Sequence, residues 1–202
     1  MLLYQRTLTA YIVNIYCRER IKYLIDSGEN FFEIGTFAAF DMYKEYGNIK
    51  KSVDELITAM DAWAADLIKE LKDSGLYEDT IIFFWSDHGV GLPRAKRWLY
   101  DSGTHIPLIV RIPEALRVGR QGEPGRVENE LVSSVDFGPT VLNLAGISVP
   151  KNTQGRAFLG KNLKESRSYI YGARDRMDER YDIIRSVRDQ RYRYIRNFEP
   201  LK

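Results

Sequence analysis

The fold of this chain is decided by the run Thr80-Ile81-Ile82-Phe83-Phe84-Trp85, which continues directly into Ser86-Asp87-His88-Gly89. The first six residues are β-branched or aromatic and show no polar alternation. Such a run is typical of a strand covered on both faces, as in the parallel sheet of an α/β protein. Polar residues at the end of this strand indicate a site, because ligands bind beyond the carboxyl ends of strands in open α/β sheets.

The segment before this strand predicts a helix. Apolar residues recur at spacings of three and four across residues 41–74, from Ile49 to Leu71, which makes one apolar stripe against a core. Gly75 follows as a residue able to adopt the left-handed conformation of a C-terminal cap. A helix, a short turn and a buried strand are half of a crossover unit, so the predicted fold class is α/β.

Three further elements are predicted towards the C-terminus. The run Pro107–Pro113 reads as a second buried strand, and residues 136–144 read as a helix with Asp136 as its N-cap. Two alternating runs, 183–188 and 191–196, are joined at Asp189-Gln190 and predict a β-hairpin. A short strand is expected at residues 168–171.

These elements divide the chain into three expected parts. Residues 1–40 form a poorly defined N-terminal segment, and residues 41–172 form the α/β part. Because a hairpin is antiparallel, the architecture changes near residue 173. Residues 173–202 are therefore expected to be the start of a small, incomplete antiparallel subdomain.

Composition excludes several classes of function. The 202 residues are 44% hydrophobic and 29% charged, as in ordinary globular proteins, and the net charge of +2 gives no reason to propose a nucleic-acid or membrane partner. No apolar run reaches the roughly 20 residues of a membrane-spanning helix. Residues 1–17 show no convincing signal peptide, so localisation is left open. Cys17, the single cysteine, cannot form an internal disulfide.

The residues after the decisive strand carry the densest chemistry. A carboxylate and a neutral imidazole, Asp87 and His88, are half of a mixed oxygen and nitrogen metal site. Arg94, Lys96 and His105 follow and could supply positive charge or protons to an anionic substrate. The plainer interpretation also stands: a turn-forming Asp beside a solvated His, followed by an exposed basic turn.

Several segments in register resemble a known family. Residues 79–89 resemble the strand and metal turn of type I, formylglycine-dependent sulfatases of the alkaline-phosphatase superfamily. Residues 96–110 resemble that family's second signature, in which a Lys precedes a Tyr-acidic-x-Gly turn and a Pro-led strand. Residues 134–146 and Gln154-Gly155-Arg156 are similar to the helix and loop that come next. The resemblance runs from about residue 41 to the end and is closest in wording to bacterial heparan N-sulfatase-like enzymes.

The resemblance implies a fold, a cofactor and roles. It implies the C-terminal half of a sulfatase sheet flanked by helices. Asp87 and His88 would be two ligands of a divalent cation, most often calcium in that family. Lys96 would be the catalytic residue that contacts the sulfate oxygens and helps to neutralise the leaving group, with His105 and Arg94 as further substrate contacts. The substrate would be a sulfated small molecule or glycan, and full-length relatives are commonly periplasmic or extracellular.

The departures from the family pattern limit the expected activity. The nucleophile of the family stands in a Cys/Ser-x-Pro-x-Arg motif, whereas Cys17 lies in Tyr16-Cys17-Arg18-Glu19-Arg20, with no proline. The family's paired aspartates have no counterpart before residue 41. We therefore expect no nucleophile in this chain, weak metal binding by two ligands where the family uses four, and no sulfatase activity by the chain alone.

Two other hypotheses stay open at this point. An Asp-His pair also fits a fragment of a phosphodiesterase or phosphonate monoester hydrolase of the same superfamily, usually with transition metals. A non-catalytic interaction module is the alternative of another class. A half sheet exposes apolar edge strands, which invite pairing with another chain or self-association.

Overall fold

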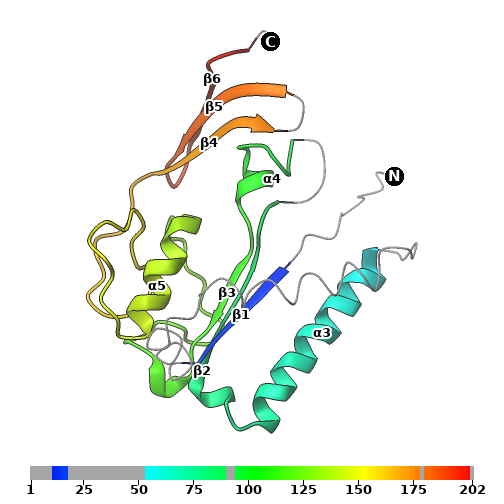
Figure 1. The fold of residues 1–202 in the computed structure, drawn as a ribbon, viewed down its shortest axis with the longest axis vertical. Coiled ribbons are helices and arrows are strands. Elements are labelled where there is room, and N and C mark those ends of the chain that lie inside the picture. The colour runs from blue at the N-terminus through cyan, green and yellow to red at the C-terminus, as the bar shows by residue number, and fades with distance from the viewer. Residues whose placement is uncertain (1–10, 18–52, 90–93, 178–179, 201–202) are drawn as a thin grey trace. The chain divides into compact units, whose positions relative to one another are not determined.

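The computed structural model describes residues 11–17, 53–89, 94–177 and 180–200. These form two compact units. The first unit runs to Leu116 but does not include Arg97–Leu99; the second unit consists of Arg97–Leu99 together with the chain from Arg117 onwards. Figure 1 shows the elements of both units along the chain.

The first unit is built on a three-stranded sheet in the order β1-β2-β3. Its strands are β1 (Tyr11–Cys17), β2 (Thr80–Ser86) and β3 (Leu108–Arg111). β2 lies in the middle, and its residues Thr80 to Phe83 and Ser86 are buried. The prediction of a buried strand at residues 80–85 is therefore confirmed, and the combination of helices and sheets agrees with the expected α/β class.

The expected parallel arrangement is wrong for the described strands. β2 pairs antiparallel with both β1 and β3, and Trp85 stands opposite Leu108. The chain leaves β2 and returns as β3 at the same edge of the sheet, so no crossover separates these two strands. The second strand is also less buried than expected, because Ile109 is 63% exposed.

Helix α3 (Val53–Asp73) supplies the predicted amphipathic stripe. Where the burial of its residues is described, its half-buried positions recur three and four residues apart, at Ala59, Met60, Trp63, Ala64, Leu67, Ile68 and Leu71. The helix ends as expected: Gly75 has φ 73°, and the N–H of Leu76 donates to the Leu71 carbonyl at 2.9 Å, which is a Schellman cap. The expected helical residues before Val53 lie outside the described part of the chain. Where the structure describes helices, none is both long and apolar enough to cross a membrane.

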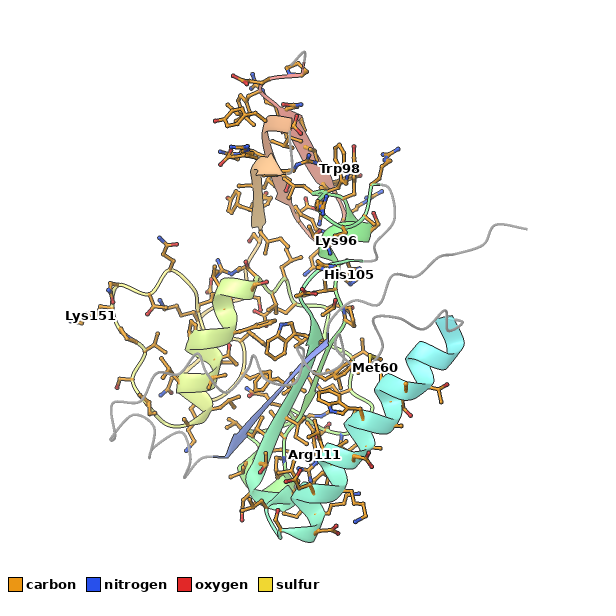
Figure 2. The ribbon with its side chains drawn as sticks, turned by 45° about the vertical axis from the view of Figure 1, so that its right-hand side comes forward. Met60, Lys96, Trp98, His105, Arg111 and Lys151 are labelled. Atoms are coloured by element: carbon orange, nitrogen blue, oxygen red, sulfur yellow. The ribbon has the colours of Figure 1, made fainter. Side chains whose placement is uncertain are left out.

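Arg111, at the end of β3, binds the segment of the first unit that leads into β2. Its Nη1 donates to the carbonyls of Tyr77, at 2.6 Å, and Thr80, at 3.2 Å, while Nη2 contacts Glu78 Oε2 at 3.0 Å. These contacts tie β3 to the short 3-10 helix η1 (Tyr77–Asp79), and a second 3-10 helix, η2 (Glu114–Leu116), follows β3. Figure 2 shows Arg111 at the opposite end of this sheet from Lys96 and His105.

The second unit contains helix α5 (Phe137–Leu144), preceded by the 3-10 helix η3 (Ser134–Asp136). Asp136 stands at the N-cap position of α5, as expected, but its side chain makes no capping hydrogen bond to this helix. Its buried carboxylate instead accepts hydrogen bonds from the backbone N–H of Ser133 at 3.0 Å and of Arg156 at 2.9 Å, and from Arg167 Nε at 3.1 Å. Asp136 is therefore the point at which the loop after α5 is fastened to the start of this helix.

A second antiparallel sheet completes the second unit. It consists of β4 (Ile170–Met177), β5 (Arg180–Arg188) and β6 (Arg193–Asn197), in that order. Strands β5 and β6 confirm the predicted hairpin. At its turn, hydrogen bonds from the backbone N–H groups of Tyr192 and Arg191 hold the pKa of the Asp189 carboxyl below its usual range.

Candidate functional site

The site begins where β2 ends. Ser86 is buried, and its hydroxyl donates to the His88 carbonyl at 2.5 Å, which closes a tight turn. The backbone N–H of Ser86 donates to the Pro107 carbonyl at 3.4 Å, at the point where the chain enters β3. The strand end and the returning chain are thus held together, and Asp87 and His88 extend from a fixed backbone.

Asp87 and His88 face each other across a short distance. His88 Nε2 lies 3.5 Å from Asp87 Oδ1. The His88 side chain is 25% exposed and the Asp87 side chain is 41% exposed. His88 Nδ1 lies 2.7 Å from the Gly89 carbonyl oxygen. Because a carbonyl can only accept a hydrogen bond, Nδ1 is the nitrogen that donates here, and Nε2 is the ring nitrogen turned towards Asp87. This is the arrangement by which a histidine is prepared as a metal ligand.

Asp87 and His88 supply fewer ligands than a complete metal site requires. Across the residues that the structure describes, no group of three or more His, Cys, Asp and Glu side chains is placed to hold a metal ion. Two donor atoms 3.5 Å apart can both reach one calcium ion, whose oxygen ligands stand at about 2.3–2.6 Å. The two residues therefore fit part of a cation site, with further ligands required from elsewhere.

A second turn is packed against the first. The short helix α4 (Asp101–Thr104) follows Tyr100, whose carbonyl accepts from the N–H of Gly103 at 2.9 Å. The N–H of Gly89 donates to the Gly103 carbonyl at 3.1 Å. A methyl group at Gly89 would lie 1.9 Å from the Ser102 carbonyl oxygen, so only glycine allows this approach. No pattern in the sequence around Gly89 predicts this close contact, because its partner is 13 residues further along the chain.

The remaining candidate residues lie on the loop between β2 and β3. The Arg94 guanidinium stacks over the Tyr100 ring at 4.5 Å, and the Arg94 carbonyl accepts from Ser102 Oγ at 2.7 Å. Lys96 is half-buried and His105 is exposed. Figure 2 shows these last two at the same end of the first unit. The structure thus brings Asp87 and His88 together and places Arg94, Lys96 and His105 on the loop that closes this edge of the sheet.

The comparison with known proteins decides the family. The sulfatase family model matches residues 19–147, which is more than half of the chain. The chain belongs to the sulfatase family. The family model matches from residue 19, whereas the resemblance based on motifs started at about residue 41. This sulfatase chain is 44% identical over 160 residues to an ulvan-active sulfatase of Formosa agariphila, with 79% of the chain aligned.

Other relatives point to the same family. A second ulvan-active sulfatase of Formosa agariphila is 32% identical over 67% of the chain, and an N-acetylglucosamine-6-O-sulfatase of Bacteroides thetaiotaomicron is 33% identical over 50%. The chain spans about a quarter of the length of each ulvan-active relative, at 24% and 26%.

A solved structure shares the fold. It is the structure of BT4656 in complex with its substrate D-glucosamine-2-N,6-O-disulfate. The TM-score is 0.55 with 23% sequence identity, over 72% of this chain and 31% of the other. This likeness supports a sulfatase-like fold for the described elements.

Proposed function

We propose that the turn Asp87-His88 and the loop carrying Lys96 form one side of a metal-dependent site for sulfate-ester or sulfamate hydrolysis. The observation that carries this proposal is the His88 ring. Its Nδ1 is bound to the Gly89 carbonyl, and its Nε2 is turned towards Asp87 Oδ1 at 3.5 Å. An imidazole nitrogen and a carboxylate oxygen that face each other, in a chain of the sulfatase family, suit a shared divalent cation.

The proposed roles follow from charge. Asp87 and His88 would hold the cation, for which calcium is our candidate; when bound, it would neutralise charge on sulfate oxygens. Lys96 contributes an ammonium group that contacts the sulfate and offsets negative charge as the leaving group departs. Arg94 and His105, on the same loop, contact the rest of an anionic substrate.

The substrate class is proposed from the relatives. One group of relatives is named for ulvan and another for N-acetylglucosamine 6-sulfate, and the solved structure holds a disulfated glucosamine. We propose a sulfated glycan or a small sulfated sugar as the substrate of the protein to which this site belongs. The basic residues Arg94 and Lys96 provide the charge that a sulfate group requires.

We expect the chain to bind calcium weakly through Asp87. Two protein ligands suggest a dissociation constant of about 10⁻⁴ M or higher. Terbium can replace calcium as a probe, because Trp85 lies two residues before Asp87 and can sensitise its luminescence. Asp87→Asn should raise the dissociation constant at least about tenfold, because a charged oxygen ligand is lost.

Asp61→Asn is the control, because Asp61 is an exposed residue on α3 and should leave the titration unchanged. Equal terbium binding by Asp87→Asn and by the unchanged chain would show that the cation is held elsewhere. A marked preference for zinc or manganese over calcium would favour a phosphodiesterase-like site instead.

The purified chain alone is expected to hydrolyse no 4-nitrophenyl sulfate. Its sequence contains no Cys/Ser-x-Pro-x-Arg segment, so we propose that the nucleophile of the reaction does not come from these 202 residues. The measurement is the release of 4-nitrophenol with and without calcium chloride. Turnover that persists through purification and disappears in Lys96→Met would contradict the missing nucleophile while supporting Lys96.

A further inference from the structure

Ser102, on the short helix α4, contacts two segments of the candidate site. Both segments and Ser102 itself belong to the first unit. The backbone carbonyl of Ser102 faces the turn after β2, since a methyl group at Gly89 would lie 1.9 Å from its oxygen. The Ser102 hydroxyl is directed to the other segment, where Oγ donates to the Arg94 carbonyl at 2.7 Å. One residue therefore holds the turn after β2 and the segment that leads to Lys96.

The contact with the turn after β2 does not involve the Ser102 side chain. The backbone N–H of Gly89 donates to the Gly103 carbonyl at 3.1 Å. His88 Nδ1 lies 2.7 Å from the Gly89 carbonyl oxygen, so the histidine ring is fixed by the same turn. Removing the hydroxyl of Ser102 should therefore leave the position of His88 unchanged.

The contact with the Lys96 segment depends on the hydroxyl. Arg94 has φ 62°, a left-handed conformation that is unfavourable for a residue with a Cβ atom. Such a conformation persists only where surrounding contacts impose it. The Arg94 guanidinium stacks over the Tyr100 ring at 4.5 Å, and the Ser102 hydroxyl binds the Arg94 carbonyl. Of these two contacts, the hydroxyl acts directly on the peptide backbone.

Lys96 comes two residues after the Arg94 carbonyl. Ala95, between them, is 2% exposed, and Lys96 is half-buried. A lysine has a flexible four-carbon stem, so the region that its ammonium group can reach depends on where the backbone is held. The bound Arg94 carbonyl and the buried Ala95 together fix the start of this stem within the first unit.

We propose that Ser102 is a positioning residue for Lys96. Its hydroxyl holds the backbone two residues before the lysine, and its carbonyl lies against the turn that carries Asp87 and His88. The two groups that would bind one sulfate ester are thus carried by segments fastened to the same residue. This inference rests on the proposed function, in which Lys96 contacts the sulfate and the turn holds a cation. Ser102 acts on the sulfate only through the backbone that it holds.

A double-mutant cycle tests the role of Ser102. The full chain is titrated with sodium sulfate in dilute calcium chloride, and the affinity is followed by backbone amide chemical shifts. The four proteins are the unchanged chain, Ser102→Ala, Lys96→Met and the double variant. We expect Ser102→Ala to weaken sulfate binding about threefold to tenfold, the range for one lost hydrogen bond. In the Lys96→Met background, the same substitution should have no effect, because the two residues act as a unit.

Cation affinity separates positioning from a general loosening of the site. Terbium titration without sulfate should give the same dissociation constant for Ser102→Ala and for the unchanged chain, since α4 contacts Gly89 through backbone atoms. Ser102→Thr keeps a hydroxyl and should restore most of the sulfate affinity. Ser74→Ala is the matched control. Ser74 is an exposed serine just after α3, and its Oγ donates to the Glu70 carbonyl at 2.8 Å. This control should change neither affinity.

The outcomes distinguish the role of Ser102 from the proposed function. If Lys96→Met weakens sulfate binding but Ser102→Ala does not, Ser102 is not a positioning residue and the role of Lys96 stands. The same conclusion follows if Ser102→Ala weakens sulfate binding equally with and without Lys96, or weakens terbium binding as much as sulfate binding. If the unchanged chain binds no sulfate, or Lys96→Met leaves sulfate affinity unchanged, the proposed role of Lys96 fails and the inference about Ser102 fails with it.

A second pair of variants covers a loss of folding. Should Ser102→Ala fail to fold, Ser102→Thr and Ser102→Val are compared in the same titrations. These two side chains have nearly the same shape and differ by the hydroxyl group. Sulfate binding about threefold to tenfold tighter in Ser102→Thr would support the positioning role. Equal sulfate affinity in the two variants would overturn it.

Discussion

Gly89→Ala is expected to destabilise the first unit by about 3 kcal/mol and to remove calcium binding. The added methyl carbon would lie 1.9 Å from the Ser102 carbonyl oxygen and 2.7 Å from Gly103 Cα. Both are backbone atoms, so no side-chain rotation relieves the overlap. The two turns must separate, and the hydrogen bond from the Gly89 N–H to the Gly103 carbonyl is lost with them. His88 loses its anchor, because its Nδ1 is bound to the Gly89 carbonyl.

Urea denaturation and terbium titration together measure this effect. Gly138→Ala is the matched control, because Gly138 lies in α5 and a methyl group there meets nothing within 4 Å. Alanine in a helix is favoured over glycine by about 0.5–1 kcal/mol, so this control should be neutral or slightly more stable. If Gly89→Ala matched Gly138→Ala in both measurements, the two turns would not be packed as described.

Asp136→Ala is expected to destabilise the second unit by about 3–5 kcal/mol. The Asp136 carboxylate is 1% exposed and accepts hydrogen bonds from two backbone N–H groups and from the Arg167 side chain. Alanine removes every one of these acceptors at once. Arg167 is left without its buried counter-ion, and the N–H groups of Ser133 and Arg156 lose their partner.

The unpaired arginine gives this prediction a sharper test. Arg167→Met keeps the apolar stem of the side chain but removes its charge, so the double variant Asp136→Ala/Arg167→Met no longer has an unpaired cation. We expect the double variant to be more stable than the sum of the single effects predicts, by at least about 1 kcal/mol in urea denaturation. If the two single changes in the free energy of unfolding add exactly to that of the double variant, Asp136 and Arg167 have no interaction energy.

Local features of the sequence predicted local structure well. The unbroken run of β-branched and aromatic residues predicted β2, and the spacing of apolar residues predicted the part of α3 that the structure describes. Gly75 ended the helix as expected, because its left-handed conformation is a property of glycine in that position. Alternation and the Asp189 turn predicted the hairpin of β5 and β6. In each case the residues that gave the prediction lie in, or next to, the element that they predicted.

Predictions failed where distant segments decide the outcome. A covered strand is compatible with parallel or antiparallel neighbours, so the residues of β2 did not reveal that β3 returns antiparallel beside it. Asp136 occupies the N-cap position of α5 as predicted, but its side chain does not cap that helix. Its partners, Arg156 and Arg167, are 20 and 31 residues away, and only folding brings them to it.

The sequence by itself determined the family, the central strand and the position of Asp87, His88 and Lys96 after it, because motifs are written in consecutive residues. Only the tertiary structure decided which distant segments lie against the turn that carries Asp87 and His88. In the first unit, the close approach of Gly89 to the Ser102 carbonyl joins residues 13 positions apart. Within the second unit, the hydrogen bond from Arg193 to the Leu99 carbonyl joins residues 94 positions apart. Such contacts depend on how strands and loops pack, which no local pattern of residue types encodes.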